Sequence, residues 1–187
     1  MGLTIRQKAD RIGGFRFVSV FLMETLAKWI PTTPELEAKV LFGRHVWVLA
    51  QHADQLGRRT GELRAPAQYS HPPTEGYVRV LETLASSAGT VERVAAFYDA
   101  FLPDLERRYR EHVAAVDHID DEPSVRIIEH ILFDLARLHQ EREAFAAQRP
   151  DLALVNAQWP AQIAALAAGE KEVVGERPVA QAAAETA

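Results

Sequence analysis

The chain contains no cysteine among its 187 residues. This absence excludes disulfide bonds, thiolate metal sites and cysteine nucleophiles, and it fits the reducing interior of a cell, so we expect a cytoplasmic location. The sequence also lacks a glycine-rich nucleotide-binding loop, a serine nucleophile elbow and a zinc motif. Kinases, hydrolases of the usual kinds and zinc enzymes are therefore excluded.

The chain also lacks a net positive charge, because its formal net charge is -5 and no part of it is strongly basic. The arginines of residues 107–110 form the one basic cluster, but Glu106 and Glu111 flank them and cancel their field. This pattern is typical of a solvated helix face. We expect no nucleic-acid partner.

Long hydrophobic runs are missing too. The most apolar stretch, residues 15–30, is interrupted by Arg16, Glu24 and Lys28. A membrane-spanning helix needs about 20 apolar residues, so this stretch is too short and too charged to cross a bilayer. It indicates a buried helix, and we expect no membrane association.

The chain does have a series of helical segments separated by proline and glycine. Proline stops a helix because it lacks an amide hydrogen, and glycine ends helices because it readily adopts left-handed geometry. The first helix is predicted to follow Gly13-Gly14 and to end before Pro31. Pro103 predicts a kink or a break about one turn upstream, near Asp99. The remaining predicted helices cover residues 34–59, 74–88, 90–116, 122–147 and, interrupted by Pro160, 151–168.

No alternating strand pattern competes with these helices, so the sequence predicts an all-α protein. The short helices and connections favour one antiparallel bundle domain over residues 1–168. Residues 64–73 contain three prolines and form an extended connection. Residues 169–187 are rich in alanine and poor in large apolar side chains, which predicts a disordered tail.

The second helix carries two histidines on its apolar side. His45 and His52 are seven residues apart, so they share a face but are separated by about 10 Å along the axis. At most one of them is expected to bind any single metal ion. The full stripe comprises Glu37, Leu41, His45, Val48, His52 and Leu56.

Other helices also direct polar groups inward. Glu24 is the only acid in the apolar part of the first helix, where an unpaired carboxylate is costly to bury. Glu129 shares the apolar side of the helix after Pro123. In the helix of residues 90–116, the polar residues nearest the apolar face are Asp99, Tyr109 and His112. Each such residue alone is more typical of a partly exposed residue at the edge of the core, with its hydrogen bonds satisfied, than of a metal ligand. Taken together, however, carboxylates and imidazole from three helices are what a carboxylate-bridged metal pair requires.

This pattern resembles the ferritin-like superfamily, on helix order, on Glu24, on the segment 41–54 and on residues 122–129. The resemblance implies an antiparallel four-helix bundle with one or two extra short helices, and a pair of iron or manganese ions. It implies metal ligands at Glu24, Glu37, His45, His52 and Glu129. The chain departs from the superfamily because no glutamate is followed three residues later by histidine.

Three functions remain open on this basis. The first is a di-iron type non-haem oxidoreductase that activates dioxygen next to a small apolar substrate. The second is a metal-free bundle that binds a small molecule or transfers protons with buried histidine and glutamate. The third is an interaction or scaffold protein whose apolar faces mediate assembly, and exposed aromatic edges favour a homodimer.

Overall fold

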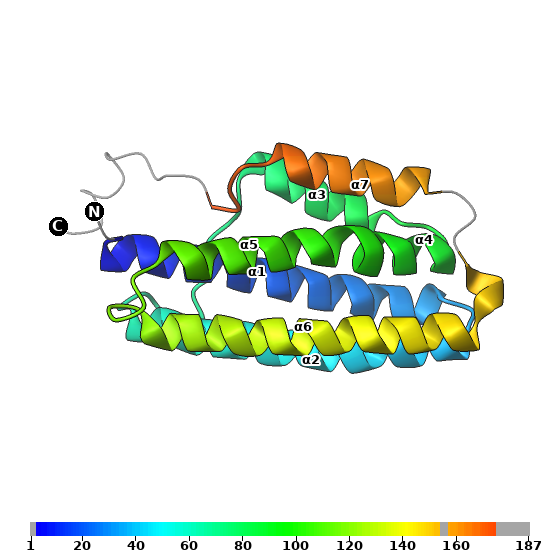
Figure 1. The fold of residues 1–187 in the computed structure, drawn as a ribbon, viewed down its shortest axis with the longest axis horizontal. Coiled ribbons are helices and arrows are strands. Elements are labelled where there is room, and N and C mark those ends of the chain that lie inside the picture. Colours follow the sequence, from blue (N-terminus) through cyan, green and yellow to red (C-terminus); the bar gives the residue numbers. More distant parts are fainter. Residues whose placement is uncertain (1–2, 154–156, 175–187) are drawn as a thin grey trace.

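A computed structural model describes residues 3–153 and 157–174, and every regular element within these ranges is helical. Consecutive long helices reverse direction along the molecule (Figure 1). The all-α prediction is therefore confirmed for the described residues, while membership of the ferritin-like superfamily stays a prediction. In chain order the elements are α1 (Ile5–Trp29), the 3-10 turn η1 (Ile30–Thr32), α2 (Leu36–Glu62), α3 (Glu75–Ala85), α4 (Thr90–Val94), the π segment η2 (Ala95–Phe101), α5 (Leu102–Ala115), α6 (Glu122–Gln148), the 3-10 turn η3 (Pro150–Leu152) and α7 (Gln158–Gly169).

The helix α1 begins about ten residues earlier than predicted. Thr4 caps it, accepting a hydrogen bond from the backbone N–H of Gln7 in a capping box. The Gly13-Gly14 pair lies inside the helix and serves close packing instead of helix termination. A Cβ on Gly13 would stand 2.9 Å from the ring of Tyr69, and one on Gly14 would collide with Val174.

Near Asp99, where Pro103 predicts a kink or a break, the structure has the π segment η2, which joins α4 to α5 without a break. Pro103 occupies the first turn of α5 and has no amide hydrogen to donate to the preceding turn. A π turn holds one residue more than an α turn, which accommodates this lost bond without breaking the helix. The segment places Tyr98 in the core, where its side chain is completely buried.

Two other helix boundaries differ from the prediction. Pro34 precedes α2 instead of opening it, because Glu35 is the N-cap residue. Pro160 does not interrupt α7, since the helix begins at Gln158 and the proline falls in its first turn, where the N–H has no intrahelical partner. The described helix is continuous to Gly169.

The helices are arranged around one core. In the view of Figure 1, α2 and α6 lie along the bottom of the molecule, and α3 and α7 lie along the top. The helices α1 and α5 lie between these two pairs. Aromatic side chains fill much of the interior; the largest fully buried ones are Tyr77, Tyr98, Tyr109, Phe42, Phe97 and Phe101.

A short segment after α7, residues 170–174, also belongs to the packed structure. The backbone N–H of Thr74 donates a 2.9 Å hydrogen bond to the carbonyl of Val173, whose side chain is buried. Arg108 donates to the carbonyls of Ala167 and Glu170, each at 2.8 Å. The tail predicted from residue 169 therefore begins with an ordered segment, and residues 175–187 lie outside the described ranges.

Among the described residues, no helix is both long enough and apolar enough to span a bilayer.

Candidate functional site

The three glutamates predicted as metal ligands lie on the surface. Glu24 keeps 53% of its side chain exposed and forms an ion pair with Lys28 at 3.5 Å. Glu37 keeps 48% exposed and pairs with Arg149 at 2.7 Å. Glu129 is exposed as well. The inward orientation expected for these three carboxylates is therefore wrong.

The error has a geometric cause in two helices. On α1, Glu24 continues the outer stripe of the partly buried Phe17 and Phe21, at helical spacings of four and three residues. On α6 the apolar face is centred one residue away from the predicted stripe, so Glu129 falls outside it. The buried apolar residues of α6 are Val125, Ile128, Ile131, Leu135, Leu138 and Phe145.

The inward orientation of both histidines is confirmed. His45 is 1% exposed, its Nδ1 lies 2.5 Å from the hydroxyl of Tyr98, and its Nε2 lies 3.3 Å from Glu141 on α6. Burial lowers the pKa of His45 to about 4, against the opposing effect of the Glu141 carboxylate. The imidazole is therefore neutral near pH 7, and it links a buried phenol to a half-exposed carboxylate.

His52 has a separate carboxylate partner. Its Nε2 lies 3.1 Å from Asp134, which also has His130 at 3.9 Å on the surface. Burial lowers the pKa of His52, and the hydrogen bond with Asp134 opposes that effect. The two histidines thus form two distinct pairs along the contact of α2 with α6, and they do not converge with Glu24, Glu37 or Glu129.

No group of three or more histidine, aspartate, glutamate or cysteine side chains is arranged to hold a metal ion in residues 3–153 and 157–174. His45 and His52 each bring one carboxylate partner, which is fewer ligands than a carboxylate-bridged iron pair uses. The iron or manganese cofactor stays a prediction of the sequence.

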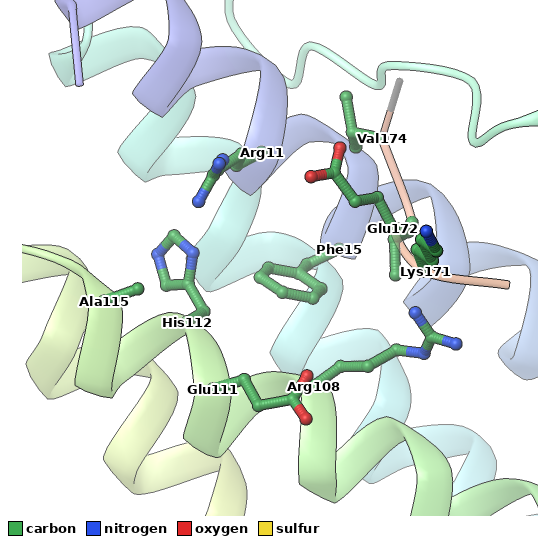
Figure 2. A pocket seen from close by; sticks show the side chains of 10 residues that line it. Arg11, Phe15, Arg108, Glu111, His112, Ala115, Lys171, Glu172 and Val174 are labelled. Carbon is green, nitrogen blue, oxygen red and sulfur yellow. The ribbon is translucent and has the colours of Figure 1, made fainter. Parts of the chain in front are cut away.

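A pocket of about 210 Å³ lies elsewhere, between the amino-terminal half of α1, the carboxyl-terminal half of α5 and the segment after α7 (Figure 2). Its floor is the ring of Phe15, which packs edge-on against His112 with 5.4 Å between ring centroids. The pocket is lined by Arg11, Phe15, Arg108, Glu111, His112, Ala115, Lys171, Glu172, Val173 and Val174.

His112 is the central polar group of this pocket. Its side chain is 6% exposed, and its Nε2 is enclosed without a hydrogen-bond partner among the described residues. Burial lowers the pKa of His112 to about 4; Arg11 lowers it further, whereas Asp121 raises it. An unsatisfied buried nitrogen costs free energy. This Nε2 is inaccessible, so it does not open into the pocket.

The charged residues of the pocket fall into two groups. Arg108 is held by Asp104 at 2.6 Å, and Glu111 by Arg107 at the same distance. Arg11, Lys171 and Glu172 make no side-chain hydrogen bond or ion pair with another described residue. The second group is available to a ligand without breaking an existing pair.

Sequence reasoning placed His112 near the apolar face of its helix but did not include it in the predicted site. The pocket combines residues 11 and 15 with residues 171–174, which are far apart in the chain. The adjacent Val173 and Val174 were an available signal, because they form a pair of large apolar residues in an otherwise polar and alanine-rich stretch.

Arg11→Gln is expected to raise the pKa of His112, because the guanidinium of Arg11 disfavours the imidazolium. Titration of the histidine ring signals by NMR measures this shift. Substitution of Arg126, which is 80% exposed on α6, provides a matched control that should leave the titration of His112 unchanged. An unchanged titration in Arg11→Gln would show that the two side chains are not neighbours.

Comparison of the chain with protein-family models, with curated proteins and with solved structures finds no match.

Proposed function

We propose that this protein binds a small organic molecule in the pocket between α1, α5 and residues 171–174. The observation that carries the proposal is the pocket itself, in which the buried imidazole of His112 lies beside the apolar side chains of Phe15 and Val173. Ligand sites typically combine an apolar wall with a few polar groups that orient the ligand. Phe15 and Val173 supply the apolar wall here, and His112 supplies an orienting group.

The size of the pocket limits the ligand. Its volume of about 210 Å³ is smaller than that of a typical site for a drug-sized molecule, which is roughly 300 to 1,000 Å³. A ligand with on the order of ten non-hydrogen atoms, such as a single substituted ring, fits this space.

Neutral His112 can act as a hydrogen-bond donor from one ring nitrogen and as an acceptor at the other. With its pKa near 4, it stays neutral over the physiological range and orients a ligand without adding a charge. These features support binding rather than proton transfer, because burial and Arg11 disfavour the protonated imidazole.

Ala115→Trp is expected to abolish binding, because position 115 lines the pocket on the exposed side of α5 and an indole ring there would fill it. Binding is measured by NMR, with benzoate, benzamide and indole as probes at millimolar concentration. In the unaltered protein, at least one probe should shift the signals of residues around His112.

Ala114→Trp is the matched control, since Ala114 is the exposed neighbour on the same helix and is not part of the pocket lining. It should leave binding intact. Equal loss in both variants would mean that a tryptophan on α5 disturbs the helix, and binding that survives Ala115→Trp would place the ligand elsewhere and refute the proposal.

A further inference from the structure

We infer that two copies of this protein associate through the outer face of α2, packed antiparallel about a two-fold axis. This face carries a stripe of apolar residues at alternating spacings of four and three, which all lie on one side of a helix. The outer stripe comprises Leu36, Val40, Gly43, Trp47 and Ala50. It shares no residue with the pocket, so this inference does not depend on the proposed function.

The large side chains of the outer stripe face solvent. The exposed fractions are 70% for Leu36, 46% for Val40 and 67% for Trp47. These are three of the seven large hydrophobic residues that are exposed in the described part of the chain, and they follow one another within about three helical turns. Such a gathered apolar surface is typical of an interaction site, and tryptophan is among the residues that contribute most to binding at interfaces.

Gly43 is a second and independent observation. A glycine inside a helix is destabilising relative to alanine, and it is retained where a close neighbour leaves no room for a Cβ. Gly57 is such a case, because a Cβ there would collide with Gln68. Gly43 lies about two turns inside α2, and a Cβ there would meet no described atom within 4 Å. The gap at Gly43 therefore fits a side chain from outside the chain.

The side chain that fits this gap belongs to the same stripe. Trp47 lies one turn after Gly43, so an antiparallel second copy places its Trp47 against Gly43. The two-fold axis then repeats this contact in the other direction. The same register places Val40 opposite Ala50 of the second copy. A protruding ring and a gap four residues apart are thus self-complementary, which favours a second copy over an unrelated partner.

The charges beside the outer stripe favour the antiparallel orientation. Lys39 lies near its start and makes no ion pair with another described residue. Asp54 lies one turn after Ala50 and keeps 41% of its side chain exposed. Antiparallel packing brings each Lys39 near the other copy's Asp54, whereas parallel packing would bring like charges together. Arg44 lies near the two-fold axis, where Glu141 balances its charge at 3.8 Å.

Sedimentation equilibrium of the full chain measures the association. One helix from each copy makes a contact at the lower end of interface sizes, so we expect a dissociation constant on the order of 10 μM. Of the three tryptophans, only Trp47 is exposed, so its emission should shift to shorter wavelength as the dimer forms. A chain that remains monomeric at about 500 μM would overturn the inference.

Gly43→Gln is the most specific variant, because it should affect the monomer and the dimer in opposite directions. Glutamine favours a helix, so the monomer should unfold at a higher urea concentration than the unaltered protein. The side chain would occupy the gap, so the dimer should dissociate about tenfold or more easily. Gly61→Gln is the matched control, since Gly61 is also exposed on α2, has no described atom near its Cβ position and lies outside the contact.

Trp47→Gln should weaken the dimer at least as much, whereas Phe133→Gln should not, although Phe133 is 65% exposed on α6. A dimer that keeps its affinity in a folded Gly43→Gln or Trp47→Gln protein would show that the contact lies elsewhere. Equal weakening by Phe133→Gln would likewise contradict a contact through α2 alone.

The orientation can be tested with introduced cysteines, because the chain has none of its own. The Leu36→Cys and Asp54→Cys variants are mixed and exposed to oxidised glutathione. Antiparallel packing should give mainly the mixed disulfide between the two variants. Ile119→Cys, at a position that is 92% exposed outside α2, is the control for random collision and should form little disulfide. Preferential pairing of each variant with itself would overturn the antiparallel arrangement.

Discussion

Lowering the pH from about 7 to about 4.5 is expected to destabilise the folded protein by roughly 2 kcal/mol for each of His45 and His112. Both imidazoles are buried, and burial lowers the pKa of each from 6.5 to about 4. His52 adds to the effect in the same direction. These contributions make acid sensitivity one of the two largest effects that the structure predicts.

The direction follows from proton uptake. Between a pH of about 6.5 and 4, a histidine in the unfolded chain binds a proton that the folded protein does not accept. The stability is therefore fully present above the unfolded pKa and is lost as the pH falls toward the folded pKa. Protonation of His45 would place a cation beside Tyr98 in the core, with only Glu141 to balance it.

Urea denaturation followed by far-UV circular dichroism at several pH values measures this effect. His112→Gln should remove the contribution of this histidine to the pH dependence, roughly 2 kcal/mol, because glutamine does not titrate. His118→Asn is the control, since His118 is exposed in the loop before α6 and its removal should leave the dependence intact. A stability that is flat down to a pH of about 4.5 would contradict the burial of both histidines.

The other large effect is expected from Arg59→Met, which should destabilise the protein by about 3 to 5 kcal/mol. Arg59 is 10% exposed and donates to Asp121 at 2.9 Å and to Ser124 at 2.8 Å. Asp121 is completely buried, and its second carboxylate oxygen has no partner among the described residues. Removal of the guanidinium would leave this carboxylate as an uncompensated buried charge.

Arg58→Met is the neighbouring control, because Arg58 is 75% exposed and its ion pair with Asp54 lies on the surface. It should cost about 0.5 kcal/mol or less. Adding Asp121→Asn to Arg59→Met should restore part of the lost stability, since the buried group would then be neutral. If Arg59→Met cost no more than Arg58→Met in chemical denaturation, the pair could not be buried as described.

Much of the fold follows from local sequence signals. The prolines and the acidic helix starts located the helices from α2 to α6, and Pro103 located the π segment. Gly13 and Gly14 misled the prediction because their role depends on Tyr69 and Val174, which approach α1 from distant parts of the chain. A glycine that stops a helix and a glycine that admits a neighbour look alike in one sequence.

The site was less predictable for a related reason. The seven-residue spacing placed His45 and His52 correctly, because helical periodicity determines which face a residue occupies. Their partners Glu141 and Asp134 depend on the register of α6 against α2, which no local pattern reveals. The predicted apolar stripe of α6 was displaced by one residue from the buried face. This displacement was enough to place the exposed Glu129 in the predicted core.

The wall of the pocket formed by residues 171–174 follows every described helix in chain order, although it packs against the first of them, α1. During synthesis on the ribosome, α1 to α6 can therefore assemble before the pocket has its last side. Until that segment emerges, Phe15 and the imidazole of His112 face water. Ligand capture would then begin only when residues 171–174 have left the ribosome, because a chain without this wall has no complete binding site.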